Sequence, residues 1–243
     1  MALAREIYEH YWEKGWAVVE NVYSIEETEH IAALATRLCE ELMQEDDYIV
    51  DSSDDGARAP RKLDLPFERH PDLRNFALDR RLSSLVGEFI NDQPLLLADQ
   101  IFMKPPHFGS KKPYHQDNGY FHCHPGDKVL TAWIALDDVD EENGCLRYIE
   151  ESNKGPILPH LPQPGEPYNF VPPADLIDLS KEALAEVRQG GVVFHHSHSL
   201  HTSHRNESDR WRRAYATHWV TAAVTSENST LDTAYFKQDT YPS

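Results

Sequence analysis

Cysteine is scarce in this sequence. The 243 residues contain three cysteines, Cys39, Cys123 and Cys145, which are widely spaced and form no CxxC pair. A small, odd number of separated cysteines argues against both a disulfide framework and a zinc ribbon. We therefore expect a reducing, cytoplasmic setting.

Long hydrophobic runs are also missing. The first dozen residues already carry several charged side chains, so they do not resemble a secretory signal. No apolar run in the sequence approaches the length that is needed to cross a bilayer. We expect no association with a membrane.

Positive charge is in deficit. There are 23 Lys and Arg residues against 41 Asp and Glu residues, which gives a formal net charge of −18. Such a chain repels nucleic-acid phosphates and anionic lipid. Hydrophobic residues make up 40% and charged residues 26%, an ordinary globular balance. The sequence thus predicts a globular protein that has no nucleic-acid partner.

The chain length fits a single domain over residues 1–243. The part from about 1 to 92 is predicted to be helical, and the part from about 94 to 235 is predicted to form a β core. An SIEE capping box at Ser24, followed by apolar residues at helical spacing, predicts one helix, and a second helical region covers about 71–91. Polar and turn residues predict a loop over 51–60.

Short strands are predicted after Pro94, because runs rich in β-branched and aromatic residues alternate with turn residues. These runs are LLLADQIFMK, KVLTAWIAL, CLRYIE, GVVFHH and RRAYATHWV. The dipeptide Asn143-Gly144 predicts a hairpin between two of them. Consecutive strands without long helices between them favour an antiparallel sandwich or barrel. The predicted fold class is mainly β with flanking helices (α+β).

A proline-rich segment stands apart from the strands. Seven prolines fall between residues 156 and 173. Proline lacks a backbone donor and fixes φ, so we expect no ladder strand there. The segment is either a rigid surface crossover or a lid beside the active site.

Histidine is abundant and clustered. The chain has 14 histidines, and nine of them fall in two short segments of the strand-rich part. They are His107, His115, His122 and His124 in the first segment, and His195, His196, His198, His201 and His204 in the second. Because imidazole is a common metal ligand near neutral pH, this clustering suggests a metal site.

The tripeptide HQD at residues 115–117 is the most specific element. Residues i and i+2 of a strand point to the same face, so the imidazole and the carboxylate are expected to converge. One more histidine from a distant strand would complete a two-histidine, one-carboxylate facial triad, which is typical of non-haem iron(II) oxygenases. Periodicity alone does not distinguish His198, His201 and His204 as that ligand.

Three longer segments together resemble the phytanoyl-CoA dioxygenase family. They read KPPHFGSKKPYHQDNGYF, TAWIALDDVDEENGCLRYIEESNKG and GGVVFHHSHSLHTSHRNESDRWRRAYATHWV. From about Gln100 to Val220 they cover about half of the chain in the family's order and spacing. The resemblance implies a double-stranded β-helix (jelly roll, cupin-like) core with N-terminal helices packed on one sheet.

The same resemblance implies an iron(II)- and 2-oxoglutarate-dependent dioxygenase that uses O2 as a second cosubstrate. The family's metal ligands match His115, Asp117 and His201. Residues of its cosubstrate pocket match Arg212, Gln100, Trp133 and Ser203. The remaining histidines of the second segment, which are left with core, supporting or solvent roles, are His195, His196, His198 and His204.

A physical argument also supports a role of Arg212 in binding 2-oxoglutarate. The distal carboxylate of 2-oxoglutarate is charged and buried, so it needs a cation, and an arginine fork can donate two parallel hydrogen bonds to it. In the family this arginine lies eleven residues after the distal histidine, and Arg212 has that spacing from His201. Arg213 points to the opposite face of the same strand. The alternative is a solvated arginine pair on an edge strand.

The implied reaction hydroxylates an aliphatic C–H of a small-molecule metabolite and releases succinate and CO2. Two alternatives use the same ligands: a metal-dependent cupin-like hydrolase or isomerase, and a noncatalytic metal-binding relative. The hydrolase or isomerase consumes neither O2 nor 2-oxoglutarate and leaves Arg212 without a role. The acidic chain lacks an obvious basic patch for coenzyme A, so we expect a small polar or amphiphilic substrate. The sequence specifies neither its identity nor the oligomeric state.

Overall fold

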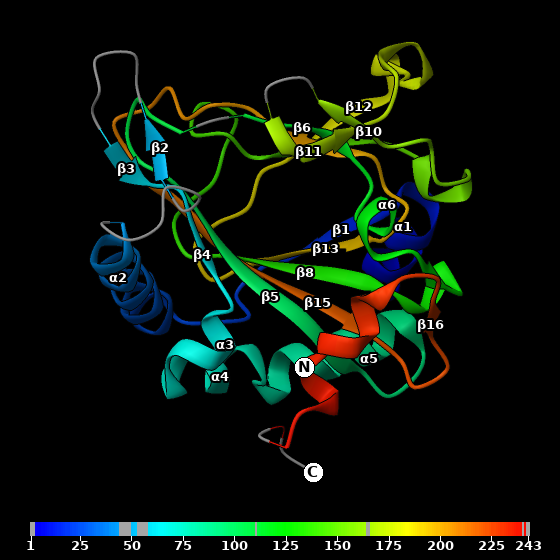
Figure 1. The fold of residues 1–243 in the computed structure, drawn as a ribbon, viewed down its shortest axis with the longest axis horizontal. Helices are drawn as coiled ribbons and strands as arrows, with labels where there is room; N and C mark the ends of the chain where they lie inside the picture. The colour runs from blue at the N-terminus through cyan, green and yellow to red at the C-terminus, as the bar shows by residue number, and fades with distance from the viewer. Residues whose placement is uncertain are drawn as a thin grey trace.

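Two antiparallel sheets face each other in the computed structural model, and helices cover the outer side of the larger sheet (Figure 1). The structure describes residues 3–43, 50–52, 58–109, 111–163, 166–239 and 241. The α-helices are α1 (Arg5–Lys14), α2 (Ile25–Leu42), α3 (Pro66–Arg69), α4 (Pro71–Ala77), α5 (Arg80–Ile90) and α6 (Asn118–Phe121). The short 3-10 helices are η2 (Gly126–Lys128), η3 (Ser152–Lys154), η4 (Ala174–Leu176), η5 (Leu179–Lys181), η6 (Ser229–Thr233) and η7 (Tyr235–Lys237).

The strands of the two sheets come from the whole length of the chain. They are β1 (Trp16–Val19), β4 (Lys62–Asp64), β5 (Leu95–Lys104), β6 (Lys112–His115), β8 (Leu130–Ala135), β9 (Leu146–Ile149), β12 (Glu182–Ala185), β13 (Val192–His196), β14 (His201–Ser203) and β15 (Arg212–Val220). Separate two-stranded ribbons are formed by β2 (Val50–Ser52), β3 (Arg58–Pro60), β7 (Cys123–His124), β10 (Leu161–Gln163), β11 (Glu166–Val171) and β16 (Thr225–Ser226).

The order of the strands is that of a jelly roll. The larger sheet has the order β1-β13-β8-β15-β5-β4, and the facing sheet has the order β12-β9-β14-β6. Most neighbours in both sheets are distant in sequence, so the chain passes repeatedly from one sheet to the other. The prediction of a double-stranded β-helix core with N-terminal helices packed on one sheet is confirmed.

Alternation along the strands of the larger sheet separates two layers of packing. On β13, Phe194 packs against the helices, whereas Val193 faces the other sheet. On β8, Ile134 belongs to the helix side and Trp133 to the inner side. This follows from the period of two along a strand. The helix side is filled by apolar packing, and the inner side also carries polar residues.

The N-terminal helices follow their local sequence signals with one exception. Ser24 Oγ accepts a hydrogen bond from Glu27 N at 3.2 Å, and the Glu27 carboxylate accepts one from Ser24 N at 2.8 Å, so α2 begins with the predicted capping box. Helices α4 and α5 occupy the predicted region over 71–91. The exception is α1, which precedes Ser24 although only two helical regions, after Ser24 and over 71–91, were predicted. Among the residues of α1 only Tyr11 is buried, which explains its weak apolar pattern.

Two predictions about connecting segments are corrected by the structure. The expected loop over 51–60 is paired at its ends as β2 and β3, while residues 53–57 lie outside the described part of the chain. The Asn143-Gly144 turn does not form a hairpin, because the flanking strands β8 and β9 belong to different sheets. Gly144 does supply the positive φ of a turn (87°). The dipeptide predicts a turn, whereas tertiary packing determines with which strands β8 and β9 pair.

The expectation that the proline-rich segment 156–173 contains no ladder strand is also wrong. Strands β10 and β11 pair antiparallel, with Pro162 opposite Phe170. In a two-stranded ribbon each strand has an unpaired edge, and a proline can be accommodated where its missing N–H faces that edge. Residues 164 and 165 lie outside the described residues.

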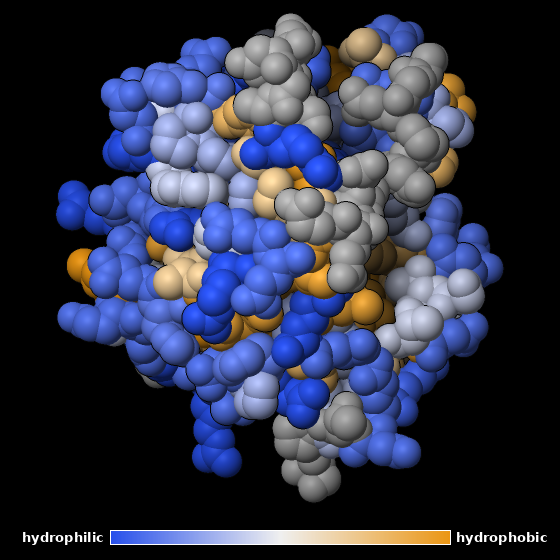
Figure 2. Space-filling view, turned by 60° about the vertical axis from the view of Figure 1, so that its left-hand side comes forward, coloured by the Kyte–Doolittle hydropathy of each residue, from blue (hydrophilic) through white to orange (hydrophobic). Residues whose placement is uncertain are grey.

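Hydrophilic side chains dominate the face that comes forward when the α2 side of the molecule is turned toward the viewer (Figure 2). Apolar side chains emerge there only in small areas between them. Of the helices in the described part of the chain, none has the length and apolar character needed to cross a bilayer.

Candidate metal centre and adjoining cavity

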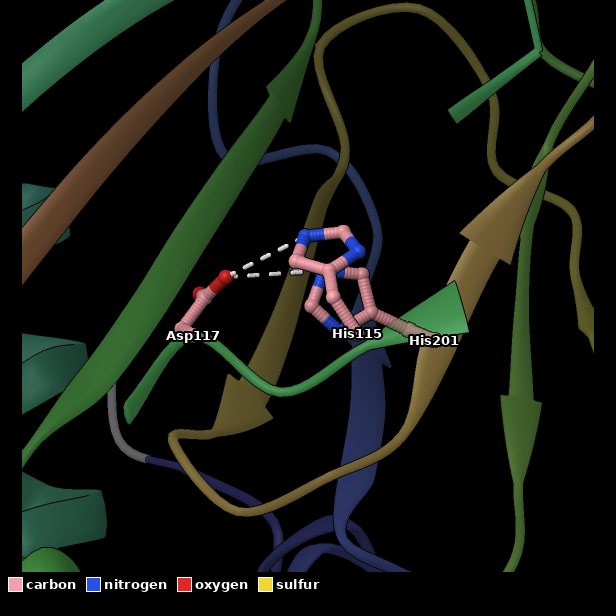
Figure 3. Close-up of side chains that lie close together, drawn as sticks. All are labelled: His115, Asp117 and His201. Atoms are coloured by element: carbon pink, nitrogen blue, oxygen red, sulfur yellow. Dashed lines mark ion pairs between the residues drawn. The ribbon is translucent and has the colours of Figure 1, made fainter. Parts of the chain in front are cut away.

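The three predicted metal ligands, His115, Asp117 and His201, lie together between the two sheets (Figure 3). His115 ends β6 and His201 begins β14, and the two strands pair with these histidines opposite each other. The Nε2 atom of each histidine lies 3.6 Å from Asp117 Oδ1. One ligand atom from each residue lies within 4.8 Å of the other two, and all three side chains are buried. This grouping has the donor set and spacing for one metal ion.

Asp117 reaches the centre by a route that the sequence did not predict. The tripeptide was expected to lie on one strand, where alternate residues share a face. Instead β6 ends at His115, and Asp117 has helical backbone angles (φ −57°, ψ −39°) at the start of α6. The turn from strand to helix therefore aims the carboxylate at the imidazoles.

Backbone carbonyls select the tautomer of both histidines. His115 Nδ1 lies 2.9 Å from the carbonyl oxygen of Pro113, and His201 Nδ1 lies 3.0 Å from that of Ser199. A carbonyl only accepts, so each Nδ1 carries the proton and each Nε2 presents its lone pair to the centre. Burial lowers the pKa of His115 well below its usual value and that of His201 to about 4. Both imidazoles are thus neutral, as metal coordination requires.

The second oxygen of Asp117 is held by the protein. Asp117 Oδ2 accepts hydrogen bonds from Thr131 Oγ1 at 2.5 Å and from His195 Nε2 at 3.0 Å. His195 Nδ1 in turn lies 2.8 Å from the hydroxyl of Tyr148. These contacts orient the carboxylate and direct Oδ1 toward the two imidazoles. Of the roles left open for His195, the structure thus gives the supporting one.

His218 was not singled out from the sequence, although it belongs to the same network. Its Nδ1 lies 2.8 Å from Thr131 Oγ1, and the side chain is buried beside the centre. Burial lowers the pKa of His218 to about 4, so the ring is neutral. Its place on β15, an even number of residues after Arg212, could have indicated that it faces inward.

The other histidines of the second segment lie away from the centre. His196 packs edge-on against Trp12 of α1. His198 lies 3.3 Å from the amide nitrogen of Asn118 and 3.4 Å from the Gly155 carbonyl. His204 is exposed, and its neighbours include Arg147. None of these three belongs to the metal-ligating group found among the described residues.

A cavity of about 560 Å³ opens beside the metal centre. All the residues that the sequence assigned to the site line this cavity. They are His115, Asp117, His201, Gln100, Trp133, Ser203 and Arg212. The structure thus brings together residues that lie far apart in the sequence, from Gln100 to Arg212.

Arg212 is a buried cation for which no hydrogen bond or ion pair is found among the described residues. Its side chain is 2% exposed, and its Nε has no hydrogen-bond partner among the described residues. Its guanidinium carbon lies 5.6 Å from the centre of the Trp133 ring. Burial lowers the pKa of Arg212 to about 10, so it remains charged near neutral pH. A buried, unpaired guanidinium is costly, and an anionic ligand in the cavity would compensate it.

Arg213, unlike Arg212, has a charged protein partner. It faces the helix side, where its guanidinium donates to both carboxylate oxygens of Asp137 at 2.6 and 2.9 Å. The alternative of a solvated arginine pair on an edge strand is excluded, because β15 lies between β8 and β5 and Arg212 is buried.

Lys104 is a cavity residue that sequence reasoning missed. It lies on the same face of β5 as Gln100, and its Nζ donates to Ser203 Oγ at 2.8 Å. It also donates to the carbonyl of His204. Strand alternation from Gln100 through residue 102 to residue 104 was the available signal.

Gln116, the middle residue of the HQD tripeptide, forms hydrogen bonds that hold the proline-rich segment beside the metal centre. Gln116 Nε2 donates to the Pro156 carbonyl at 3.2 Å, and Gln116 Oε1 accepts from Leu158 N at 2.7 Å. Farther along, the hydroxyl of Tyr120 accepts from Phe170 N at 3.1 Å. Phe170 lines the cavity. The described part of this segment therefore forms a wall beside the centre.

Comparison with known sequences identifies relatives of the chain. The family description Phytanoyl-CoA dioxygenase (PhyH) matches residues 11–214. Phytanoyl-CoA dioxygenase domain-containing protein 1 from Mus musculus is 32% identical over 161 residues, which cover 64% of this chain and 55% of that protein. Peroxisomal phytanoyl-CoA dioxygenase from Mus musculus is 26% identical over 224 residues, covering 86% of this chain and 66% of that protein. The first match thus spans about half of the relative's length.

Solved structures give a likeness that extends over nearly the whole chain. A non-heme alpha ketoglutarate dependent carbocyclase from nogalamycin biosynthesis superposes with a TM-score of 0.72 at 25% sequence identity. The superposition covers 92% of this chain and 86% of the carbocyclase. It therefore includes most of both sheets, between which the cavity lies.

Proposed function

The chain belongs to the phytanoyl-CoA dioxygenase family, and from that premise we propose that it is an iron(II)- and 2-oxoglutarate-dependent oxygenase. One observation carries the proposal: two neutral imidazoles and a carboxylate converge in a cavity that also holds a buried guanidinium, whose Nε has no acceptor among the described residues. Two histidines and one carboxylate with open positions form the donor set of non-haem iron(II) oxygenases. A zinc or manganese hydrolase would use the same three ligands but gives Arg212 no task.

His115, Asp117 and His201 would hold the metal. When bound, iron(II) supplies the activation of dioxygen that accompanies decarboxylation of 2-oxoglutarate. Arg212 binds the distal carboxylate of 2-oxoglutarate, because its buried Nε faces the cavity side and lacks an acceptor among the described residues, while its fork can donate two parallel hydrogen bonds. His195 and Thr131 keep the Asp117 carboxylate oriented. Trp133 and Gln100 form the walls around the cosubstrate.

The proposed outcome is hydroxylation of an aliphatic C–H of a small molecule. One substrate C–H becomes C–OH, while O2 and 2-oxoglutarate become succinate and CO2 together with the inserted oxygen atom. A cavity of about 560 Å³ has the capacity for a metabolite-sized ligand. The similar carbocyclase uses alpha ketoglutarate for a different outcome. We propose that substrate placement near the metal decides the product and that this chain belongs to the hydroxylating group.

Anaerobic titration with iron(II) and 2-oxoglutarate tests the proposal. The wild type should develop a weak visible charge-transfer band, and His115→Ala should not. His198→Ala is the matched control, since His198 lies outside the metal-ligating group, and it should retain the band. Persistence of the band in His115→Ala would remove this residue from the ligand set.

Aerobic incubation without a prime substrate separates the oxygenase from the alternatives. We expect slow, uncoupled release of succinate with consumption of O2. A metal-dependent hydrolase or isomerase, or a noncatalytic relative, would consume neither cosubstrate. Metal-loaded wild type that neither binds 2-oxoglutarate nor releases succinate would overturn the proposal.

A further inference from the structure

Two buried cations stand side by side at the end of the cavity formed by β5 and β15. Lys104 and Arg212 are direct cross-strand partners in the antiparallel pair of these strands. Both line the cavity, and their exposed fractions are 5% and 2%. Directly opposite residues place their side chains on the same face of a sheet, a few ångström apart. Two basic groups are therefore buried together, and each makes a positive charge on the other less favourable.

The described protein residues do not neutralise this pair. The hydrogen bonds of Lys104 go to the Ser203 hydroxyl and the His204 carbonyl, both of which are uncharged. Asp51 attracts the Lys104 charge, but it is itself paired with Arg61, whose Nε lies 3.7 Å from its Oδ1. Burial and the charge of Arg212 lower the pKa of Lys104 well below its usual value. An anion bound between the two side chains would relieve both the repulsion and the desolvation.

We propose that Lys104 and Arg212 together clamp the distal carboxylate of 2-oxoglutarate, with Ser203 holding the lysine in place. This inference rests on the proposed function. The ammonium group has three donors, and the two protein acceptors leave one for the ligand. The guanidinium offers its fork, and the lysine adds a point charge that the fork alone lacks. Ser203 thereby acts as a positioning residue for Lys104.

The clamp makes a prediction about selectivity. A 2-oxo acid chelates the metal through the same two groups whether or not it carries a second carboxylate. 2-Oxopentanoate has the chain length of 2-oxoglutarate but ends in a methyl group. The ratio of the two dissociation constants therefore reports on the Lys104–Arg212 end of the cavity and not on the metal end. Loss of Lys104 should reduce this ratio.

Dissociation constants measured with manganese(II) in place of iron test this prediction without turnover. The variants are Lys104→Met, the conservative Lys104→Arg, and Lys111→Met as a control that removes an exposed lysine from the cavity rim. Lys104→Met should weaken binding of 2-oxoglutarate by about 10-fold or more and change binding of 2-oxopentanoate by less than about 2-fold. Lys104→Arg should restore part of the selectivity, and Lys111→Met should leave it unchanged.

The outcomes distinguish a clamp from a structural role. If Lys104→Met weakens both ligands equally, the lysine only maintains the cavity and the inference is overturned. If Lys104→Met binds both ligands as the wild type does, the inference is also overturned while the proposed function stands. Thermal unfolding and manganese(II) affinity of each variant identify a change that comes from misfolding, in which case the ratio for Lys104→Arg decides.

Glutarate keeps the test independent of the oxygenase proposal. It carries the distal carboxylate but has no 2-oxo group with which to chelate a metal. We expect glutarate to raise the unfolding temperature of the metal-free wild type by more than it raises that of Lys104→Met at the same concentration. If the wild type responds to glutarate but never turns over 2-oxoglutarate, the clamp is supported and the oxygenase assignment fails. If the wild type binds neither dicarboxylate, both fail.

Discussion

The two faces of the six-stranded sheet treat buried charge in opposite ways. On the helix side, the Asp99 carboxylate accepts hydrogen bonds from Tyr215, Tyr235 and the backbone of Phe67. On the cavity side, Arg212 keeps an Nε that has no partner among the described residues. One face provides its carboxylate with hydrogen bonds from the protein, whereas on the other face we propose that a ligand binds the guanidinium. The helix face of this sheet thus contributes to stability, and its inner face lines the proposed binding site.

This difference arises from adjacent residues. Arg212 and Arg213 follow each other on β15, and His195 and His196 follow each other on β13, yet each pair divides between the two faces. Because successive side chains of a strand point to opposite faces, neighbouring substitutions should have separable effects. Inner-face changes should alter ligand binding, and outer-face changes should alter the free energy of unfolding.

The largest contrast is expected between two buried carboxylates. Asp117→Ala should abolish iron(II) binding, because Asp117 Oδ1 is the oxygen that faces both imidazoles. Asp99→Asn removes a carboxylate from the other face and should leave iron(II) affinity unchanged. Anaerobic equilibrium dialysis with iron(II) measures both. Tight iron(II) binding by Asp117→Ala would contradict the assignment of Asp117 as a metal ligand.

The adjacent arginines should give the next largest contrast. Arg212→Met should weaken 2-oxoglutarate binding by about 100-fold, as expected when one partner of a buried charge pair is lost. It should not lower the stability of the ligand-free protein, because an unpaired buried charge disappears.

Arg213→Met is the matched change on the other face. It should spare 2-oxoglutarate affinity and lower the free energy of unfolding by about 1 kcal/mol, because the half-buried pair with Asp137 is lost. Isothermal titration measures the 2-oxoglutarate affinity of both variants, and chemical denaturation measures their free energies of unfolding. Equal loss of affinity in the two variants would show that the faces are not independent.

The adjacent histidines of β13 test a weaker, indirect effect. His195→Phe removes the hydrogen bond to Asp117 Oδ2, and it should reduce metal affinity by about 10-fold, since groups that orient a ligand typically contribute this much. His196→Phe changes a ring that packs near Trp12 and should leave metal affinity unaltered. Competition with a chelator measures both affinities. Unchanged affinity in His195→Phe would mean that Thr131 alone orients the carboxylate.

The strand pattern predicts more of the fold than of the site. The runs that begin at Leu95 and Arg212 match β5 and β15 at both ends, because alternation and turn residues are local properties. Lys104 and His218 face the cavity through the same alternation, but their importance depends on what lies across the sheet. Cross-strand register is set by tertiary packing. A residue that acts through a neighbour from another strand is therefore visible only in the structure.

The turn residues illustrate the same limit. Asn143-Gly144 predicts a turn correctly, yet the following strand joins the opposite sheet. Proline at 162 was taken to exclude a ladder strand, but the ribbon of β10 and β11 tolerates it. In both cases the local chemistry restricts one residue, whereas the partner of the strand is chosen by the rest of the molecule.

A further predicted effect is a pH dependence that arises on the helix side. Burial raises the pKa of Asp99 to about 7, whereas in the unfolded chain it is about 3.9. The folded state then binds this proton more tightly, so the stability that protonated Asp99 contributes is present below about pH 4 and is lost as the pH rises through about 7.

Asp99→Asn cannot titrate and should not show this loss. The free energy of unfolding of the wild type minus that of Asp99→Asn should therefore fall by about 2–3 kcal/mol between about pH 5 and pH 8. Gln100→Ala, the adjacent change on the cavity face, should differ from the wild type by an amount that does not vary with pH. Urea denaturation at the two pH values measures these differences. If the difference in free energy of unfolding between the wild type and Asp99→Asn does not vary with pH, the Asp99 carboxylate is ionised despite its burial. The hydrogen bonds from Tyr215, Tyr235 and Phe67 would then compensate the cost of burying its charge.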